Sequence, residues 1–376
     1  MKKILFKKLL LDYMSFFLIA LIASSIIIWV FQAVNFLDIM IEDGRNYLVY
    51  INYSLLNFPK IFSKLFPFVL FFSLFYVTVK YELNNELIIL WNFGINKIQI
   101  INFILIISVC LMLIQVILTS IVVPSSQDKA RSFLRNSKVN FFENFIKPQR
   151  FNDAISNVTI YSEKKDKEGT LHNLYIKKEI DRDNLQITYA KKGVFREIGN
   201  FPILVLFEGE TITQKNNKFT NFSFSKSDFS LENLNTNTTT FIKTQEISTI
   251  DLLQCINFLY DLKLVTKKID IQNCSENNIK NILKEFYKRL IIPLYIPTLT
   301  LIPFLLIIKS KENLNFFKIR IATFVIGLIF IILSETTIRM ISKILNENLI
   351  LLSIPLISFM FLYFLFLYKF SLGIKK

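Results

Sequence analysis

Six apolar stretches without a single charged residue are the feature that most limits how this chain can fold. They form two groups of three, at Tyr13–Leu37, Leu65–Val79, Ile98–Ser126, Leu290–Ile308, Ile321–Ser334 and Asn348–Tyr368. A helix needs about 20 predominantly apolar residues to cross a bilayer. The second and fifth stretches are shorter and reach that length only by extending past Lys64 and Glu335. The pattern predicts six transmembrane helices, three on each side of a polar insert.

The composition agrees with a membrane protein. Hydrophobic residues make up 52% of the 376 residues and the mean hydropathy is +0.44, whereas soluble domains contain about 45 to 50% apolar residues with glycine counted. The basic segment Met1–Lys8 is followed by an apolar stretch much longer than the roughly 7 to 15 residues of a signal peptide. We therefore expect an uncleaved first span.

The net charge of +15 is unevenly distributed. Residues 124–285 contain 24 Lys and Arg against 20 Asp and Glu, so most of the excess lies in the short flanks of the apolar stretches. Four clusters of basic residues stand out in these flanks, and they contain Lys2, Lys3, Lys7, Lys8, Lys80, Lys97, Lys309, Lys311, Lys318, Arg320, Lys369, Lys375 and Lys376. With six spans all of them fall on one side, which the positive-inside rule makes cytoplasmic. The insert is then outside, and both termini are in the cytoplasm.

The chain divides into residues 1–123 with three spans, an insert at 124–285 and residues 286–376 with three more. Short runs rich in β-forming residues occur in the insert at Asn157–Tyr161, Leu174–Lys178, Leu185–Tyr189, Ile203–Phe207 and Phe219–Phe224. They predict an antiparallel sandwich or jelly-roll-like sheet with flanking helical segments. Such a sheet can hold an apolar ligand between its faces, or it can simply contact other proteins.

Proline and cysteine add local expectations. Pro293, Pro297 and Pro303 should break regular helix in the fourth span. Cys255 and Cys274 lie 19 residues apart on the outer side, where a disulfide can form, although two cysteines define no framework and buried thiols are the simpler alternative.

Catalytic or metal-binding patterns are missing from the sequence. The only histidine is His172, which we expect on a surface strand, and no phosphate-binding Gly-x-x-x-x-Gly-Lys-Ser/Thr loop or Cys/His metal cluster occurs. We therefore expect no cofactor and no ATP hydrolysis by this chain alone. Glu335 is the one carboxylate that a span must include, and a charge at membrane depth marks a functional candidate. Arg339 stands four residues later, so an internal ion pair is the simpler reading.

The segment between the second and third spans contains a short amphipathic pattern. Residues 82–94 predict a helix with one apolar face that ends at a glycine, and Asn96 with Gln99 resembles a capping box at the start of the third span. Such a helix can lie flat on lipid or insert into a groove of a partner. The pattern favours neither.

The pattern Glu86-Leu87-x-x-Leu90-x-x-x-Gly94 in this segment resembles the coupling helix of the LptF/LptG lipopolysaccharide export permeases. Three spans, an outer β-jellyroll and three more spans also match that family over nearly the whole chain. The segments Asn35–Asp38, Ser156–Ser162 and Ala190–Val194 resemble the family pattern as well, and the first of them is closer to the LptF branch. Trp91-Asn92-Phe93 departs from it, because small and basic residues are common there.

The resemblance implies the permease subunit of an ABC transporter that extracts lipopolysaccharide from the bacterial inner membrane and passes it to a periplasmic bridge. The implied partners are an LptG-type permease, an LptB-type cytoplasmic ATPase dimer and LptC/LptA-type jellyroll proteins. Glu86 would meet a basic group on the ATPase, with Leu87, Leu90 and Trp91 as apolar anchors and Gly94 ending the helix. Hydrolysis of ATP would occur in the ATPase.

The lipid carries anionic phosphates beside several acyl chains, so its site needs an apolar cavity rimmed by cations. The family lines that cavity with spans one and five. Lys60 and Lys64 at the outer end of span two, and Arg339 and Lys343 at the outer end of span five, have the required chemistry. Arg339 matches a basic family position. The lysines can instead extend to ordinary phospholipid head groups.

Two other classes of protein fit parts of the pattern. A membrane-anchored enzyme or periplasmic ligand sensor would need a catalytic or ligand-binding constellation, which the sequence does not contain. A different type of ABC permease with an outer domain would have fewer spans and another position for that domain.

Overall fold

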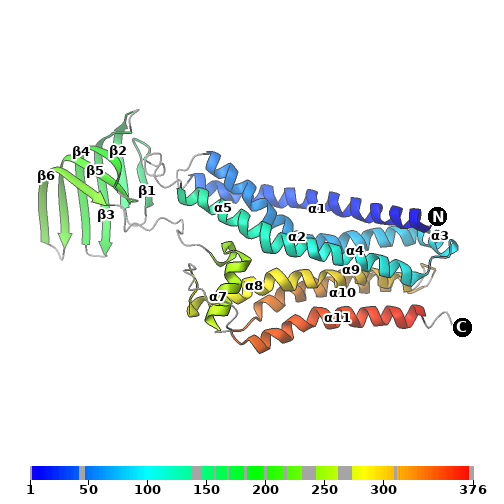
Figure 1. Cartoon of the computed structure of the whole chain (residues 1–376). Helices are drawn as coiled ribbons and strands as arrows, with labels where there is room; N and C mark the ends of the chain where they lie inside the picture. Colours follow the sequence, from blue (N-terminus) through cyan, green and yellow to red (C-terminus); the bar gives the residue numbers. More distant parts are fainter. Residues whose placement is uncertain are drawn as a thin grey trace. The chain divides into compact units, whose positions relative to one another are not determined.

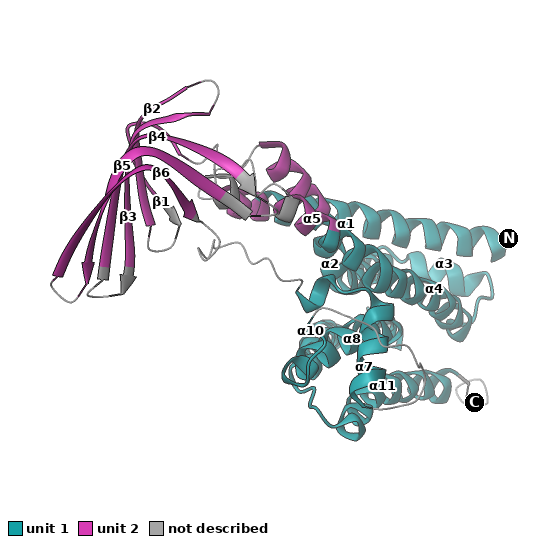
Figure 2. Ribbon diagram, turned by 60° about the vertical axis from the view of Figure 1, so that its left-hand side comes forward, with its two compact units in different colours: residues 1–30, 57–128, 242–376 teal, residues 31–56, 129–241 magenta. Residues whose placement is uncertain are grey.

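The computed structural model describes residues 2–41, 47–136, 146–155, 158–166, 169–181, 184–198, 201–215, 218–230, 243–260, 273–308, 311–312 and 314–371. Ser156 and Asn157 of the predicted strands, and Lys309, Lys375 and Lys376 of the basic clusters, lie outside these residues. The chain forms two compact units (Figure 2). Unit 1 contains Met1–Val30, Asn57–Asp128 and Ile242–Lys376, and unit 2 contains Phe31–Leu56 and Lys129–Phe241.

Six helices are long and apolar enough to cross a membrane, as the sequence predicted. They are Lys2–Leu37, Tyr47–Leu83, Lys97–Leu134, Glu276–Ile308, Phe316–Arg339 and Leu345–Phe370. The two short apolar stretches do extend past their charges, because Lys64 lies inside the second helix and Glu335 inside the fifth. The start of the first helix and the end of the sixth lie at the same end of unit 1 (Figure 1).

The helical elements follow the chain in a simple order. They are α1 (Lys2–Ile41), α2 (Tyr47–Leu83), α3 (Glu86–Asn92), α4 (Lys97–Ile117), a π-helical turn at Leu118–Val122, α5 (Val123–Asn136), α7 (Thr249–Leu259), α8 (Ile279–Leu294), α9 (Ile296–Leu301), a 3₁₀ segment at Ile302–Ile308, α10 (Phe316–Arg339) and α11 (Leu345–Ser371). Short 3₁₀ turns at Thr244–Glu246 and Glu276–Asn278 precede α7 and α8.

Prolines interrupt the fourth span, as predicted. Pro293 lies in the last turn of α8, Pro297 in the first turn of α9, and Pro303 in the 3₁₀ segment that follows. Proline removes a backbone donor and clashes with the preceding turn, so a helix can continue only by changing its hydrogen-bond pattern. Because this span is mostly buried by its neighbours, those neighbours surround the irregular backbone and shield it from lipid.

Helices α2 and α10 are in direct contact at Gly327. A β-carbon built on Gly327 would lie 1.9 Å from Cζ of Phe71, so the ring occupies the space that any side chain would need. The rings of Phe72, Phe75 and Phe324 surround Phe71, with centroids 5.5 to 6.3 Å from its own. The two sets of spans therefore meet at a glycine beneath an aromatic cluster.

Unit 2 contains one six-stranded antiparallel sheet, which curves visibly in Figure 2. Its strands are β1 (Phe151–Ile155), β2 (Val158–Lys165), β3 (Leu171–Asp181), β4 (Asn184–Ile198), β5 (Phe201–Lys215) and β6 (Lys218–Ser230). They are neighbours in sequence order. The predicted antiparallel insert is confirmed, and the connections between these strands form an up-and-down meander rather than the Greek key of a sandwich.

One face of the sheet is apolar and largely buried. In one row across four strands, Ile160, Ile176 and Thr188 are paired in register with Thr211, and the first three are at most 3% exposed. The row ends on β6 at Phe222, which is 68% exposed. The row therefore runs from two buried isoleucines through a hydrogen-bonded pair of threonines to a large uncovered ring at the β6 edge.

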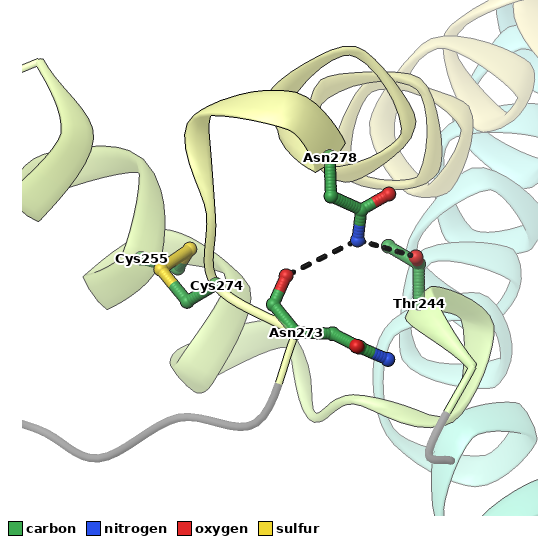
Figure 3. Close-up of a disulfide and its surroundings, with 5 residues drawn as sticks. All are labelled: Thr244, Cys255, Asn273, Cys274 and Asn278. Atoms are coloured by element: carbon green, nitrogen blue, oxygen red, sulfur yellow. Dashed lines mark hydrogen bonds between the residues drawn. A yellow bond between two sulfur atoms is a disulfide. The ribbon is translucent and has the colours of Figure 1, made fainter.

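A disulfide joins Cys255 of α7 to Cys274, just before α8 (Figure 3). The sequence had left a bridge and buried thiols open, and the bridge is the observed state. Beside it, Nδ2 of Asn278 donates to the carbonyl of Asn273 (3.1 Å) and to Oγ1 of Thr244 (3.3 Å). These bonds hold together the two turns that lead into α7 and α8.

Candidate functional site

The segment between α2 and α4 is a short helix between two residues with left-handed backbone. Asn85 has φ 62° and Gly94 has φ 70°. After α3, the N–H of Gly94 donates to the carbonyl of Trp91 (2.9 Å) and the N–H of Ile95 to that of Leu90 (3.2 Å), the two bonds of a Schellman motif. A short helix that ends at Gly94 is present as predicted, but it spans Glu86–Asn92 rather than residues 82–94, because residues 82 and 83 continue α2.

The apolar face predicted from the sequence packs inward. Leu87 and Leu90 are 2% and 6% exposed and belong to the core of the helical unit. Both side chains are therefore covered by the bundle itself. On the opposite side of α3, Ile88, Ile89 and Phe93 are 42 to 50% exposed. The family resemblance predicted that Leu87 and Leu90 point outward, and the structure buries both. The apolar residues at 88, 89 and 93 are the sequence signal of a helix that is apolar on two sides.

Glu86 begins α3 and is partly exposed. Its Oε1 accepts a long hydrogen bond (3.5 Å) from Nδ2 of Asn84. Trp91 is half-buried and packs against the core. The outward surface of α3 thus combines one carboxylate with three apolar side chains, which suits a basic and apolar groove on another protein.

The C-terminal end of the segment is tied to two spanning helices. Nζ of Lys2 in α1 donates to the carbonyl of Gly94 (2.9 Å). At the start of α4, the backbone N–H of Asn96 donates to Oε1 of Gln99 (3.3 Å), within the predicted capping box. Helix α3 therefore cannot move far without α1 and α4.

Lys97 and Glu82 connect the same segment to the second set of spans. Nζ of Lys97 donates to the carbonyl of Ile307 (2.8 Å), near the end of the fourth span. The buried Oε1 of Glu82 accepts from the backbone N–H of Lys311 (2.9 Å), and Nζ of Lys311 donates to the carbonyl of Leu83 (3.2 Å). Sequence reasoning treated these lysines only as topological charges.

At the opposite end of unit 1, Lys60 is engaged in protein contacts. Its Nζ donates to Oε1 of Gln127 (3.4 Å) and to Oε1 of Gln245 (3.2 Å), and Nε2 of Gln127 donates to Oδ1 of the buried Asn57 (2.8 Å). Lys60 is one turn from Lys64 on α2, but only Lys64 is exposed. A role for Lys60 in lipid binding would require breaking these bonds.

A buried arginine extends this polar cluster. The Arg289 guanidinium donates to Oγ1 of Thr249 (2.8 Å) and to the carbonyls of Gln245 (3.2 Å) and Ile247 (3.0 Å), and its Nε contacts Glu285 (3.4 Å). Its side chain is 2% exposed. The residue fixes the segment before α7 to α8, and nothing in the sequence distinguished it from the surrounding basic residues.

Arg339 and Lys343 lie at the end of α10 and in the turn after it, and both are exposed. The Tyr260 hydroxyl donates to the carbonyl of Lys343, which leaves the ammonium group of that lysine outward. Among the interactions of the described residues, no ion pair joins Glu335 to Arg339. The simpler reading of Glu335 as half of an internal pair is therefore wrong, and both side chains are exposed.

Unit 2 contains several pairs of titratable side chains, and one of them includes the single histidine of the sequence. His172 in β3 lies 2.6 Å from Oδ2 of Asp166. The hydrogen bond from His172 lowers the pKa of Asp166. Within the described ranges, no three His, Cys, Asp or Glu side chains converge on a possible metal position.

Comparison with known proteins places the chain in a family. A family model described as "Lipopolysaccharide export system permease LptF/LptG" matches residues 8–369. The chain is also similar to "Uncharacterized protein RP871" of Rickettsia prowazekii (strain Madrid E), with 26% identity over 294 residues that cover 76% of this chain and 78% of that protein. The family match does not separate the LptF from the LptG branch. Because it extends over nearly the whole chain, this multi-pass inner membrane protein belongs to the LptF/LptG family of lipopolysaccharide export permeases.

Proposed function

We propose that this chain is a non-catalytic permease subunit of an ABC transporter that extracts lipopolysaccharide from the inner membrane and delivers it to a periplasmic bridge. The observation that carries the proposal is α3, a short helix held firmly on the bundle with Glu86, Ile89 and Phe93 facing away from it. A permease without a nucleotide-binding loop needs such a contact surface, through which the conformational changes of a separate ATPase reach the spanning helices.

The two ends of unit 1 support an orientation. The end that carries α3 also carries the basic residues Lys2, Lys80 and Lys318, and lysine and arginine gather on the cytoplasmic side. The disulfide Cys255–Cys274 lies beyond the other ends of the spans, and disulfides persist in oxidising compartments such as the periplasm. Both features favour α3 in the cytoplasm and unit 2 in the periplasm.

The contact with an LptB-type ATPase dimer would use the outward side of α3. Ile88, Ile89 and Phe93 would enter an apolar groove, while Glu86 would pair with a basic group at its rim. Leu87, Leu90 and Gly94 would keep α3 seated on the bundle during that contact. A paralogous LptG-type permease would present a second such helix to the other ATPase copy.

The lipid would meet cations at the outer end of the spans. Lys64, Arg339 and Lys343 are exposed there and can pair with lipid phosphates. Lys60 would act indirectly, by fixing α2 against the polar cluster. Phospholipid head groups are the competing partners for all exposed cations at this depth.

Unit 2 would receive the acyl chains and pass them on. The row of side chains across its sheet ends at Phe222 on β6, which is an uncovered ring on a 13-residue strand. Strand β1 has only five residues and an irregular register, so the longer β6 is the better edge for adding a strand of an LptC/LptA-type jellyroll.

The test is co-purification of the full chain from membranes with its candidate paralogue and ATPase. Wild type is compared with Glu86→Ala and Ile89→Asp, and with Glu347→Ala as a control that removes an exposed carboxylate from the opposite end of unit 1. We expect wild type and Glu347→Ala to retain the ATPase and to hydrolyse ATP. The two α3 variants should remain folded but recover little ATPase activity.

Two results would contradict the proposal. A wild-type chain that purifies alone at every stringency would revive the ligand-sensor alternative. Equal ATPase recovery with Ile89→Asp and wild type would show that the outward side of α3 is not the contact surface.

A further inference from the structure

We propose that Lys97 is the positioning residue that couples movement of α3 to the fourth and sixth spans; this inference deepens the function proposed above and rests on it. Lys97 is the first residue of α4 and is half-buried. Three different elements meet at its ammonium group. None of the sequence patterns assigned it more than a topological charge.

The contacts of Lys97 link the α3 segment to the second set of spans. Its Nζ lies 5.6 Å from the centre of the Trp91 ring in α3 and 5.5 Å from that of the Phe370 ring in α11. The same atom donates to the carbonyl of Ile307 at the end of the fourth span (2.8 Å). A cation held between two aromatic faces and a carbonyl is attracted by all three.

The carbonyl of Ile307 can accept a hydrogen bond from a side chain because it lies at the end of the fourth span, where the helix is irregular. Ile307 is the penultimate residue of a 3₁₀ segment that ends at Ile308, and the last carbonyls of a helix have no partner within the helix. Ile307 is 3% exposed, so an unpaired carbonyl at this position would be costly. Lys97 supplies a donor to this carbonyl, and the fourth span is thereby attached to the segment that carries α3.

Glu82 makes a second connection of the same kind. Its carboxylate accepts from the backbone N–H of Lys311, between the fourth and fifth spans, and Lys311 returns a bond to the carbonyl of Leu83. The two connections flank α3 in sequence. A displacement of α3 is therefore transmitted to the second set of spans through Lys97 and Glu82. The bond from Lys2 to Gly94 transmits it to α1.

The Trp91 contact can be tested without any partner. The chain contains two tryptophans, so Trp29→Phe leaves Trp91 as the only tryptophan reporter in the full-length protein. In that background we expect Lys97→Met to change the Trp91 emission maximum and to increase its quenching by acrylamide. Lys318→Met is the control, because it removes an exposed lysine from the same end of the bundle. Identical Trp91 spectra for Lys97→Met and its parent would refute the contact.

The coupling role is tested in the complex with paralogue and ATPase, reconstituted in vesicles that contain lipopolysaccharide. Lipid release is measured per ATP hydrolysed for wild type, Lys97→Met, Lys97→Arg and Lys318→Met. We expect Lys97→Met to retain the ATPase and its hydrolysis but to release roughly tenfold less lipid per ATP, within the usual range of coupling between sites. Arginine keeps the charge and the donor, so Lys97→Arg should recover most of the release.

The outcomes separate this inference from the proposed function. Absence of the ATPase from the wild-type preparation refutes the proposed function, and with it the coupling role, before any variant is compared. With wild type active, normal lipid release per ATP in Lys97→Met refutes the coupling role alone. Loss of the ATPase in Lys97→Met would make Lys97 an assembly residue and would also overturn the inference.

Glu82 provides an independent pair of variants should Lys97→Met prove unfolded. Glu82→Gln keeps an oxygen that can accept the N–H of Lys311, whereas Glu82→Ala removes it. Reduced lipid release per ATP in Glu82→Ala but not in Glu82→Gln is the expected result. Equal release by the two variants would show that this connection carries no movement.

Discussion

Replacing Gly327 by alanine should separate α2 from α10, because the new methyl group has no room. It would lie 1.9, 2.1 and 2.7 Å from three atoms of the Phe71 ring, whereas carbon atoms pack at about 3.5 to 4.0 Å. Phe71 is fully buried, and the rings of Phe72, Phe75 and Phe324 pack against it, so a displaced Phe71 ring would disturb this cluster. The helices must therefore move apart or the ring must leave its position.

Two opposing terms set the magnitude. Overpacking of this kind costs about 1 to 3 kcal/mol, and the overlap here favours the upper part of that range. Against this cost, alanine inside a helix is more stabilising than glycine by roughly 0.5 to 1 kcal/mol. We expect Gly327→Ala to lower the free energy of unfolding by about 2 kcal/mol, which corresponds to a fall in the thermal midpoint of roughly 2 to 3 °C for a chain of this length.

The assay is thermal unfolding of the purified full-length chain in detergent, with a double-mutant cycle. Phe71→Leu shortens the obstructing side chain, so the double variant Gly327→Ala/Phe71→Leu should lose less stability than the sum of its parts, by at least about 1 kcal/mol. Gly94→Ala is the matched control. It is strained by its left-handed backbone and meets nothing within 4 Å, so Phe71→Leu should not relieve its cost of roughly 1 to 2 kcal/mol.

The reasoning would be refuted by an unchanged or higher midpoint for Gly327→Ala. Strict additivity with Phe71→Leu would refute it as well, because the two residues would then not share a contact.

Three further predictions follow from other contacts. Arg289→Met leaves its buried acceptors unpaired, so we expect a loss of roughly 3 to 5 kcal/mol, read as faster proteolysis of residues 243–260. Reduction of the Cys255–Cys274 bridge, which closes a 19-residue separation, should lower the thermal midpoint by an amount equivalent to about 3 kcal/mol, and a Cys255→Ser/Cys274→Ser variant should not respond to reductant. The hydrogen bond from His172 lowers the pKa of Asp166. The stability that this bond contributes is therefore present above the ordinary carboxyl pKa and is lost as the pH falls through the lowered value. In a plot of the thermal midpoint against pH, the decline on the acid side should be shallower for Asp166→Asn than for wild type.

Much of the fold could be predicted because it depends on the solvent rather than on particular contacts. Uncharged stretches such as Tyr13–Leu37 leave the chain no stable state outside lipid, and Pro293 and Pro303 must interrupt a helix wherever it packs. The turn at Gly94 was predictable for a different reason, because the left-handed backbone conformation that ends a helix is a local property of the glycine. Short runs rich in β-forming residues likewise indicated strands β2 to β6 before any partner strand was known.

The sequence could not determine which side of an element faces the protein. Residues 82–94 contain apolar side chains on two sides of α3, and only packing against the bundle decided that Leu87 and Leu90 face inward and Phe93 outward. The meander of the sheet was equally undetermined, because strand order depends on pairing and not on strand composition.

The sequence by itself determined six spans, their two groups of three, a strand-rich insert and the clustering of positive charge, because each is a property of composition along a segment. Only the tertiary structure decided the partners of individual polar groups. It assigned Lys60 to two glutamines, Arg289 to a buried turn, Lys97 to a carbonyl 210 residues away, and Cys255 to Cys274 in a bridge. The physical reason is that a charge can reach only the groups within a few ångströms of it, and folding alone brings distant segments that close.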